Sequence, residues 1–452
     1  MKDDRPYWNM EIEPKFNTPE MREIQEIKLR GKIKALREGA PYYTRLFKQC
    51  GVNEKTSFEE LRRAMPVFTK ADWRELVKVH NGDIMEAMNQ IIPVNAYEDL
   101  YLIASTTGTT GEPEPYPFTQ KDLWDVYGEA LARYNWRAGL RSGDRMLHCF
   151  ALSMVIAGIP TLIGAFKLGC TVIPVGAEGG TERILKTAGY YKPTALMGTP
   201  SLALYLIEKV PEALGTDVGK MGIKTILCGG EPGAGLPEVR RRIESAFGCK
   251  LFDVGGALGI SCDHQEYQGL HQVGDDLMIL DLVDPDTKEP LPFENGRKGE
   301  MVMTCIDGDA FGGAFRRSPG DIIQIFTDPC PCGRSGFRYK IVGRVDDMLK
   351  VKGVMVYPDM IRKVIESFVP QVTGQFRIVL DEPPPRVVPP LKLKVEHGAD
   401  IPENKLKVLA SEIAEAMSKD IKIRPEIIWV SPNELERSTY KGKVFEKTYE
   451  KK

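Results

Sequence analysis

The chain has 452 residues, of which 42% are hydrophobic, and it carries a formal net charge of -2. A chain of this length can bury large cores, so two or three domains are expected. The near-neutral charge excludes the strongly basic or acidic balance that is typical of nucleic-acid-binding and membrane-surface proteins. We therefore predict no nucleic-acid partner and no membrane partner.

Three further features bear on the compartment. Residues 1–9 have no apolar segment after their charges, so we expect no signal peptide and a cytoplasmic location. The most apolar stretch, 152–176, is interrupted by polar residues, which favours a buried helix and a strand at 170–175 over a membrane span. The 9 cysteines have no regular spacing, which argues against a disulfide framework.

The pattern of helices and strands begins with charged amphipathic helices at 19–38 and 57–64. From about residue 120 onward, predicted helices and strands alternate. Such alternation is typical of largely parallel sheets covered by helices, with ligands at the carboxyl ends of the strands. The helices are expected near 180–189, 201–209 and 236–247, and the strands that follow them at 194–197, 224–227 and 250–253.

After Gly320-Asp321 the pattern changes to short strands and turns, and a polar turn at 343–347 introduces a small αβ tail. Helices are expected in this tail near 358–367 and 402–418, and the proline-rich segment 382–386 is most simply a rigid exposed loop.

The sequence therefore predicts the α/β class with two domains. The large N-terminal domain comprises residues 1–343 and has mostly parallel sheets. The small C-terminal α+β domain comprises residues 344–452.

Residues 104–113, Ala-Ser-Thr-Thr-Gly-Thr-Thr-Gly-Glu-Pro, are rich in hydroxyl groups and follow a strand-like apolar segment. Hydroxyls donate to phosphate oxygens, and glycines let backbone N–H groups approach an anion closely. The segment lacks the Gly-Lys-Ser/Thr of a Walker loop, so it predicts a triphosphate-binding loop in another fold. The alternative is a surface linker. The hydroxyl donors are Ser105, Thr106, Thr107, Thr109 and Thr110, and the glycines are Gly108 and Gly111.

Several motifs, taken in order, resemble phenylacetate-CoA ligases, and the resemblance covers nearly the whole chain. These proteins belong to the adenylate-forming superfamily, together with acyl-CoA synthetases and luciferases. The resemblance implies activation of a carboxylic acid by ATP and Mg²⁺, followed by transfer of the acyl group to coenzyme A. The motifs are Tyr7-Trp8-Asn9, 41–47, Phe68-Thr69-Lys70, the hydroxyl-rich loop, 168–174 with Thr181-Glu182-Arg183, and 343–354.

The resemblance also implies a nucleotide site. The phosphate loop would hold the β- and γ-phosphates, and Asp253 would contact the exocyclic amine of adenine. Asp321 would accept both ribose hydroxyls, a task that suits the two oxygens of a carboxylate. Arg344 would assist at the ribose or the phosphates. Without the resemblance, an Asp after Gly320 is equally well explained as a turn residue. The segment expected to border adenine is Gly229, Gly230, Glu231 and Pro232.

A C-terminal lysine completes the adenylation site in the family. The segment 437–441 aligns without a gap and selects Lys441, with Lys443 as the alternative. Asp346 matches the hinge about which the small domain rotates between the two half-reactions, so the C-terminal domain is expected to be mobile.

Two departures from the family pattern concern the metal. Glu112 stands where a lysine usually follows the phosphate loop. The family's Tyr-Gly-x-Thr/Ser-Glu is replaced by 255–259, Gly-Gly-Ala-Leu-Gly, so the usual acid for Mg²⁺ and the ring that stacks on adenine are absent. Either Asp263 or Glu266 replaces that acid, or phosphates and water hold Mg²⁺, or catalysis has been lost.

By family position, the acid pocket is formed by His148, Phe150, Ala151, Gly255 and Gly256. Each is also compatible with plain core packing, and a buried His148 held by a backbone carbonyl is the more common arrangement. The glycine at 255 leaves room beside the substrate. We predict an aromatic or other compact carboxylic acid.

Cys262, His271, Cys330 and Cys332 offer three thiolates and an imidazole, the donors of a closed tetrahedral site. Some proteins of the resembled family carry zinc with this arrangement, and full ligation by protein would make the zinc structural. His264 is the alternative nitrogen ligand. The other interpretation is reduced cysteines in turns without a metal.

The sequence thus predicts an ATP-dependent, AMP-forming acid–CoA ligase with a carboxylic acid, ATP and coenzyme A as its small-molecule partners. The large domain would bind ATP and the acid and hold the zinc, and the small domain would carry the lysine. Two alternatives stay open: an adenylating enzyme that transfers the acyl group to an amine, alcohol or carrier protein, and a non-catalytic nucleotide-binding homologue. A monomer and a homodimer are both compatible with the sequence.

Overall fold

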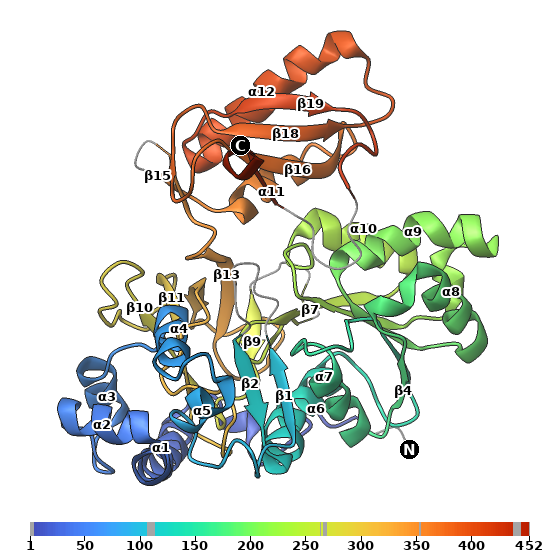
Figure 1. Ribbon diagram of the computed structural model, residues 1–452. Helices are drawn as coiled ribbons and strands as arrows, with labels where there is room; N and C mark the ends of the chain where they lie inside the picture. Colours follow the sequence, from blue (N-terminus) through green and yellow to red (C-terminus); the bar gives the residue numbers. More distant parts are fainter. Residues whose placement is uncertain are drawn as a thin grey trace.

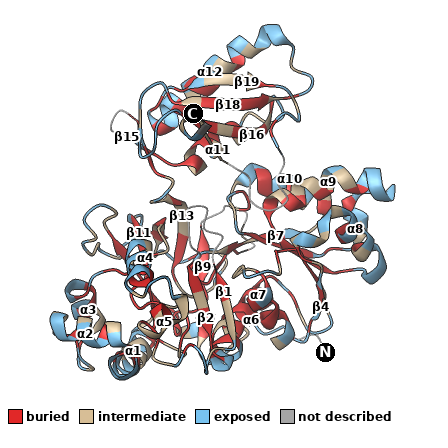
Figure 2. Ribbon diagram, in the orientation of Figure 1, coloured by how far each residue is buried: buried red, intermediate tan, exposed pale blue. Residues whose placement is uncertain are grey.

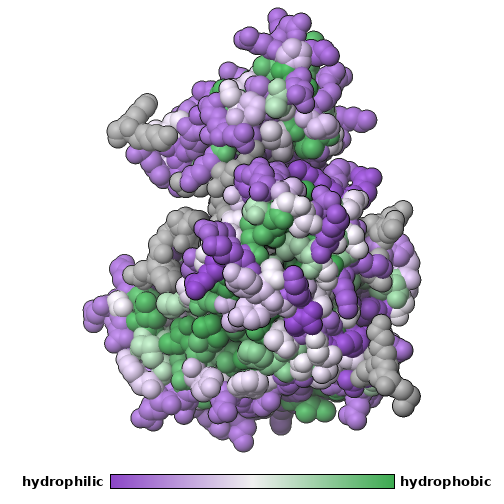
Figure 3. Space-filling model, turned by 90° about the vertical axis from the view of Figure 1, so that its right-hand side faces the viewer, coloured by the Kyte–Doolittle hydropathy of each residue, from purple (hydrophilic) through white to green (hydrophobic). Residues whose placement is uncertain are grey.

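The computed structural model describes residues 4–105, 114–262, 264, 269–351, 354–436 and 444–451. A large part, which contains the N-terminal helices and the main sheet, lies below a smaller part formed by the C-terminal residues (Figure 1). In the space-filling view the molecule narrows between the two parts, and the small part has a mostly hydrophilic surface (Figure 3).

The main sheet has 11 strands in the order β10-β11-β12-β13-β9-β8-β7-β6-β5-β3-β4. Five neighbouring strands at one end are parallel, as the alternation of helices and strands predicts. These are β3 (Arg145–His148), β4 (Thr171–Pro174), β5 (Ala195–Gly198), β6 (Thr225–Gly229) and β7 (Lys250–Gly255).

Helices cover both faces of this parallel half, because successive side chains of a strand point to opposite faces. Met146 of β3 packs in a core with α6 and α7, whereas the next residue, Leu147, packs in a separate core with α8, α9 and α10. Both faces are therefore buried, and Figure 2 shows the strands in red between their helices. The helices are α6 (Gly128–Arg137), α7 (Ile159–Lys167), α8 (Gly180–Tyr191), α9 (Pro200–Leu214) and α10 (Pro237–Phe247).

The other half of the main sheet is antiparallel, which differs from the predicted mostly parallel arrangement. No helix separates these strands in the described residues, and short connections can join only antiparallel neighbours. The predicted α/β class is confirmed, but the prediction of mostly parallel sheets is corrected, because the main sheet is mixed. The strands are β8 (Gly259–Ile260), β9 (Leu270–Gln272), β10 (Met278–Val283), β11 (Lys298–Cys305), β12 (Asp321–Phe326) and β13 (Arg338–Arg344).

The N-terminal helices pack in a third core, which also includes Ile279 of the main sheet and residues 306–315. Capping boxes begin two of them: Ser57 and Glu60 at α3, and Thr69 and Asp72 at α4. The strand expected before the hydroxyl-rich loop is β1 (Leu102–Ser105), which forms a two-stranded sheet with β2 (Pro115–Phe118) outside the main sheet. The helices are α1 (Pro19–Gly39), α2 (Pro41–Cys50), α3 (Phe58–Ala64), α4 (Lys70–Val79) and α5 (Ile84–Asn89).

The C-terminal residues have a separate core that runs from Leu349 to Tyr449. Its helices, α11 (Pro358–Glu366) and α12 (Glu403–Ile421), confirm the two expected there, and the proline-rich segment 382–386 is exposed as predicted. Two sheets have the orders β15-β14-β17 and β19-β18-β16-β20. The strands are β14 (Leu349–Val351), β15 (Val354–Val356), β16 (Val372–Leu380), β17 (Arg386–Val387), β18 (Lys392–His397), β19 (Glu426–Val430) and β20 (Phe445–Lys447).

Five short helical turns complete the elements: η1 (Glu13–Lys15), η2 (Asp122–Tyr127), η3 (Ala177–Gly179), η4 (Val218–Met221) and η5 (Thr448–Lys451). The apolar stretch 152–176 folds as α7 followed by β4, the expected buried helix and strand. Among the helices of the described residues, none has both the length and the apolar character needed to cross a membrane.

Candidate active site

The predicted phosphate-binding loop starts at Ser105, the last residue of β1. The backbone N–H of Ser105 donates to the carbonyl of Met154 at 2.5 Å, and the carbonyl of Ser105 accepts from the N–H of Ile156 at 2.9 Å. The residues expected to grip the phosphates, Thr106 to Gly111, lie outside the described residues, and so does Glu112. The start of the loop is therefore attached to the segment that leads into α7.

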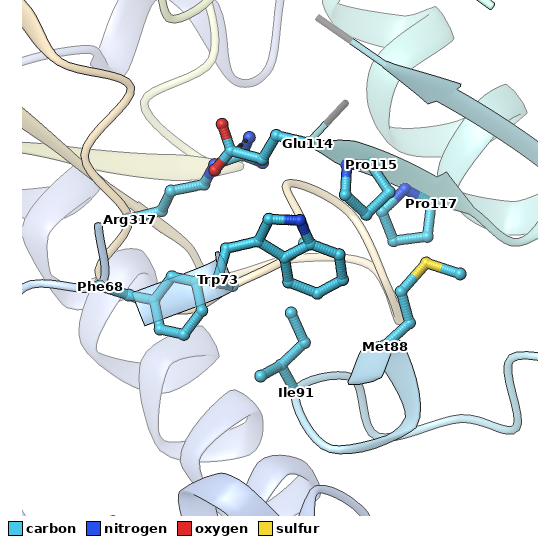
Figure 4. Close-up of a pocket in the computed structure, with 10 residues that line it drawn as sticks. Phe68, Trp73, Met88, Ile91, Glu114, Pro115, Pro117 and Arg317 are labelled. Carbon is cyan, nitrogen blue, oxygen red and sulfur yellow. Dashed lines mark ion pairs between the residues drawn. The ribbon is translucent and has the colours of Figure 1, made fainter. Parts of the chain in front are cut away.

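The chain after the loop is held by an ion pair. The Glu114 carboxylate lies 2.9 Å from the guanidinium of Arg317, and both side chains are buried. Beside them is a cavity of about 10 Å³ that Trp73 also lines (Figure 4). The indole N–H of Trp73 is buried and has no hydrogen-bond partner among the described residues. A cavity of this size holds about one water molecule.

The segment expected to border adenine lies at the carboxyl end of β6. Gly229 is the last residue of β6, and a Cβ there would lie 2.2 Å from the carbonyl oxygen of Val254 on the neighbouring strand. Gly230 has a φ of +82°, which favours glycine, and a Cβ on it would lie 3.7 Å from the Phe150 ring. The structure thus brings a predicted pocket residue against the predicted adenine segment.

Glu231, the next residue, is turned inward. Its carboxylate accepts from the backbone N–H of Ser201 at 2.8 Å, at the start of α9. Burial raises the pKa of Glu231, while the Ser201 hydrogen bonds and the charge of Arg362 on α11 lower it. A residue of the small domain therefore acts on the predicted adenine segment. Pro232 follows Glu231 in the same turn.

Asp253 and Asp321 come from strands on either side of Tyr339. Asp253 lies on β7, where its N–H donates to the Ser261 hydroxyl at 2.9 Å. Burial raises the pKa of Tyr339, and the charges of Asp321 and Asp253 raise it further. The two carboxylates predicted to hold adenine and ribose therefore both act electrostatically on the same buried phenol.

Asp321 and Arg344 are directly opposite each other on the antiparallel strands β12 and β13. Arg344 donates one hydrogen bond to the Asp321 carboxylate and a second to the Pro319 carbonyl at 2.9 Å. The structure thus pairs two residues that the sequence predicts for the ribose and the phosphates.

The predicted hinge residue, Asp346, follows β13 and pairs with Lys70 at the start of α4. The Lys70 ammonium lies 2.7 Å from the Asp346 carboxylate, and the Arg344 guanidinium lies 3.8 Å from it. Burial raises the pKa of Asp346, but the hydrogen bond and charge of Lys70, together with the charges of Arg344 and Arg74, lower it below its ordinary value. Sequence reasoning did not assign Lys70 to the site, because residues 70 and 346 are distant in the chain.

His148, at the end of β3, is completely buried. Its Nε2 lies 2.8 Å from the Thr161 hydroxyl and 3.2 Å from the Ala157 carbonyl. Burial lowers the pKa of His148 to about 4, so the ring is neutral at pH 7. This geometry is the core arrangement that we gave as the alternative to substrate contact. Phe150 packs edge-on against His148 with the ring centroids 5.7 Å apart. Ala151 follows Phe150 and is also buried.

Tyr339 lies beside the glycines of the segment 255–259. Its hydroxyl donates to the Gly255 carbonyl at 3.0 Å. A Cβ on Gly256 would lie 2.9 Å from the Tyr339 hydroxyl, and one on Gly259 would lie 2.2 Å from it, whereas a Cβ on Gly255 would meet nothing within 4 Å. The room predicted beside Gly255 is therefore bounded on the Gly256 side by Tyr339. Asp263 and Glu266, the predicted substitutes for the Mg²⁺ acid, lie outside the described residues.

The four predicted metal ligands, Cys262, His271, Cys330 and Cys332, come together. Their ligand atoms all lie within 4.8 Å of one another. The sulfurs of Cys262 and Cys330 are 3.8 Å apart, and the sulfur of Cys332 is 3.4 Å from Nε2 of His271. Hydrogen bonding from Cys332 and His271 lowers the pKa of Cys262 and favours its thiolate. The cluster contains His271 and does not include His264, the alternative nitrogen ligand.

This geometry fits a tetrahedral zinc site. Zinc–sulfur bonds of about 2.3 Å place two sulfurs about 3.8 Å apart, and a nitrogen bond of about 2.0 Å places nitrogen about 3.5 Å from sulfur. Three thiolates and a neutral imidazole around Zn²⁺ carry a net charge of about -1. The buried Arg137 interacts electrostatically with both Cys332 and His271 and supplies opposite charge, although burial lowers its pKa to about 10.

Comparison with known proteins agrees with this site. Residues 44–308 match the family model of the AMP-binding enzyme, and residues 353–447 match the C-terminal domain of AMP-binding enzymes. A phenylacetate-coenzyme A ligase from Thermus thermophilus is 28% identical over 454 residues, covering 95% of this chain and 97% of the relative. A phenylacetate-coenzyme A ligase from Escherichia coli is 28% identical and covers 77% of each chain.

Solved structures of a 2-hydroxyisobutyryl-CoA ligase are 26% identical to the chain. Its postadenylation state with 2-HIB-AMP superimposes with a TM-score of 0.86 and covers 100% of this chain and 94% of that chain. An open conformation scores 0.71, covering 98% and 95%, and the thioesterification state scores 0.67, covering 100% and 94%.

The fold and the residues gathered at its site define an adenylate-forming enzyme, and the predicted class of AMP-forming acid–CoA ligase is confirmed. The chain belongs to the AMP-binding enzyme family, whose model matches more than half of its length. The resemblance to phenylacetate-CoA ligases is likewise confirmed over most of the chain.

Proposed function

We propose that the enzyme activates an aromatic or other compact carboxylic acid with ATP, forms its acyl-adenylate, and transfers the acyl group to coenzyme A. The observation that carries this proposal is the pairing of Asp321 with Arg344 beside the hinge residue Asp346. A carboxylate for ribose and a cation for phosphate then lie where the two domains meet. The phenylacetate-CoA ligases among the relatives support an aromatic substrate.

The proposed nucleotide contacts follow the geometry of the strands. Ser105 and the loop after it would hold the β- and γ-phosphates, and Gly229 to Pro232 would border adenine. Asp253 would accept from the adenine amine, and Asp321 would accept from the ribose hydroxyls. ATP, with Mg²⁺ bound mainly by its phosphates and water, brings concentrated negative charge into this site. Arg344 and the C-terminal lysine would stabilise that charge as the carboxylate attacks the α-phosphate.

The proposed acid pocket contains Phe150, Ala151, Gly255 and Gly256, with His148 as a buried support at its base. Phe150 lies against Gly230 and His148, so its ring can bound both the adenine segment and the acid. The open space at the Gly255 Cβ position gives the substrate room in one direction. A planar aromatic ring fits an apolar pocket with this shape.

We also propose that Cys262, His271, Cys330 and Cys332 bind one structural zinc ion. Four protein ligands leave no position for substrate or water, so the metal supplies stability and no chemistry. It would connect the turn after β8 with β9 and with the turn before β13. These strands also carry Arg338 and Tyr339, so the metal would support the floor of the active site.

The functional division that we propose is residues 1–343 for binding ATP and acid, and residues 344–452 for the mobile small domain. A separate core that begins at Leu349 supports this division. A cytoplasmic location remains a prediction. The sequence prediction of either a monomer or a homodimer also stays open.

Pyrophosphate release with a panel of aromatic and short-chain acids, with and without coenzyme A, tests the proposed function. We expect acid-dependent release and formation of an acyl-CoA thioester with at least one aromatic acid. Release without any thioester would instead favour transfer to an amine, alcohol or carrier protein. No release with any acid would contradict the enzyme interpretation and favour the nucleotide-binding homologue.

The C-terminal lysine is tested by Lys441→Ala with Lys443→Ala as its matched control. Both positions lie outside the described residues. Loss of one group that stabilises transition-state charge costs about 10²–10³ in rate, so Lys441→Ala is expected to slow adenylation by about this factor. Thiolation from preformed adenylate is expected to change much less. The measurement is acid-dependent ATP–pyrophosphate exchange, and a larger loss in Lys443→Ala would reverse the assignment.

A further inference from the structure

We propose that Lys70 is a positioning residue that holds the hinge residue Asp346 in the arrangement used for adenylation. This inference rests on the proposed two-step function. It assigns the balance between the two half-reactions to an ion pair between the N-terminal helices and the hinge, which are 276 residues apart in the chain.

Lys70 has a fixed place in the large domain. It is the first residue of α4, and the capping box of Thr69 and Asp72 defines the start of that helix. Phe68, two residues before Lys70, is held on both sides: its N–H donates to the Arg316 carbonyl at 2.8 Å, and its carbonyl accepts from the Ser318 N–H at 2.9 Å. The backbone at Lys70 is therefore attached to the segment that leads directly into Asp321.

Asp346 is the moving partner. Its side chain is 51% exposed and that of Lys70 is 29% exposed, so the pair is accessible to solvent and can open without a large cost of desolvation. The preceding residue, Val345, donates its N–H to the Gly320 carbonyl at 2.8 Å. A change of φ and ψ at the hinge would redirect the Asp346 carboxylate, whereas Lys70 would stay where α4 places it.

The structure has the domain arrangement in which the pair is formed. The chain was compared with two states of the same 2-hydroxyisobutyryl-CoA ligase, which is 26% identical to it. The TM-score is 0.86 for the postadenylation state and 0.67 for the thioesterification state. Since the sequences compared are the same, the difference reflects the arrangement of the domains. The Lys70–Asp346 ion pair therefore belongs to the arrangement found next to the adenylation step.

An interaction shifts an equilibrium between two arrangements only if its strength differs between them. The Lys70–Asp346 ion pair meets this condition when hinge rotation separates its charges. Because partly exposed ion pairs are weak, we expect loss of the pair to change the equilibrium between the two domain arrangements by about two- to fivefold. The apolar contacts among Ile322, Met348 and Tyr357 stabilise the same junction and remain when the ion pair is removed.

The first experiment compares Lys70→Met with Lys78→Met, a matched exposed lysine on the same helix. ATP–pyrophosphate exchange reports adenylation, and a single turnover from enzyme-bound acyl-adenylate to coenzyme A reports thiolation. We expect Lys70→Met to slow exchange about threefold and to leave thiolation unchanged or faster, with Lys78→Met close to wild type in both. Equal losses in both half-reactions would overturn the proposal.

A double-mutant cycle separates hinge positioning from a direct contact of Lys70 with the nucleotide. Once Asp346→Asn is present, adding Lys70→Met is expected to cause little further loss of exchange. The charge swap of Lys70→Asp with Asp346→Lys is expected to recover part of the exchange that either single change removes. Fully additive losses would show that Lys70 acts on the nucleotide or elsewhere, and would overturn the proposal.

A measurement without turnover keeps the proposal independent of the proposed function. Hydrogen exchange at the backbone amides of residues 345–348 is expected to be about two- to fivefold faster in Lys70→Met than in wild type and Lys78→Met. If no acid supports pyrophosphate exchange in wild type, the proposed function fails while this comparison still tests the ion pair. Unchanged hydrogen exchange at the hinge would contradict the positioning role.

Discussion

Asp275 is a buried carboxyl group in the segment between β9 and β10. It accepts a hydrogen bond from the backbone N–H of Asn17 at 3.1 Å. Burial raises its pKa to about 7, and the neighbouring Asp276 raises it as well, whereas the Asn17 hydrogen bond and the charges of Arg137 and Arg133 lower it. The folded protein therefore binds a proton at Asp275 at pH values where the unfolded chain has released it.

The sign of the resulting pH dependence follows from this difference. Between pH about 4 and pH 7 the folded state binds more protons than the unfolded state, so the contribution of Asp275 to stability falls as pH rises. A pKa difference of about three units corresponds to at most about 4 kcal/mol. Asp275→Asn keeps an acceptor for Asn17 but cannot ionise.

We therefore expect Asp275→Asn to gain stability relative to wild type as pH rises from 5 to 8. Urea unfolding of both proteins at several pH values measures this difference. Asp99→Asn, at an exposed site, is the control and is expected to show no comparable trend. A difference between Asp275→Asn and wild type that does not change with pH would contradict the raised pKa.

Individual residues also differ in how far the sequence alone could point to them. Asp321, Arg344 and Asp346 were assigned to the site through the resemblance to phenylacetate-CoA ligases, because each stands in a short motif that can be matched residue by residue. Lys70 and Tyr339 have no such local signal. Their roles depend on contacts with residues distant in sequence, Lys70 with Asp346 and Tyr339 with Gly255 and Gly256.

At the scale of elements, β13 and the start of α11 meet without space for a methyl group. A Cβ on Gly343 would lie 2.3 Å from Cδ1 of Tyr357, the residue before α11. Overpacking of this kind commonly costs about 1–3 kcal/mol. The contact joins the large domain to the small domain. A clash there would therefore shift the two domains relative to each other, while the core of each domain would stay intact.

Gly343→Ala is thus expected to slow adenylation about tenfold while it leaves the thermal unfolding of the large domain nearly unchanged. ATP–pyrophosphate exchange and differential scanning calorimetry measure the two effects. Gly31→Ala in α1, where a Cβ meets nothing within 4 Å, is the control and is expected to retain wild-type exchange. Normal exchange in Gly343→Ala would show that the arrangement seen here is not required for adenylation.

The elements themselves were predictable to different degrees. The helix–strand alternation between 180 and 255 was correct because amphipathic helices and buried strands have strong local patterns. The sequence indicated short strands after Gly320-Asp321, but it did not indicate their antiparallel pairing or the strands from β8 to β11. Nearly all residues of β8 to β11 are buried, which removes the alternation of polar and apolar residues. The isolation of β1 and β2 from the main sheet was equally hidden, because strand pairing is a property of the tertiary fold.

For the whole molecule, the candidate zinc site has a measurable consequence for stability. The cluster connects the end of β8 with β9 and the turn before β13, so metal binding favours the folded state. We expect about one zinc ion per chain after purification without chelator. Prolonged treatment with a strong chelator, or Cys332→Ser, is expected to lower the melting temperature by roughly 5–10 °C.

Cys50→Ser is the matched control, since Cys50 lies outside the cluster and is only partly buried. Elemental analysis gives the zinc content, and thermal unfolding gives the stability of each form. Zinc content near zero in freshly purified wild-type protein, or an identical shift for Cys50→Ser, would contradict a structural zinc site.

The sequence, through its resemblance to phenylacetate-CoA ligases, predicted the class of enzyme, which is confirmed. The two-domain division and the polar groups assigned to the site stay predictions. It could predict the class because the hydroxyl-rich loop, the Gly-Asp turn and the hinge motif are short local motifs that match the resembled family in order along the chain. Only the tertiary structure decided which long-range partners those groups have: Arg344 with Asp321, Lys70 with Asp346, His271 with three cysteines, and Tyr339 beneath the glycines at 255–259. The physical reason is that such contacts arise from the packing of a mixed sheet and two domains, and packing depends on the whole chain at once.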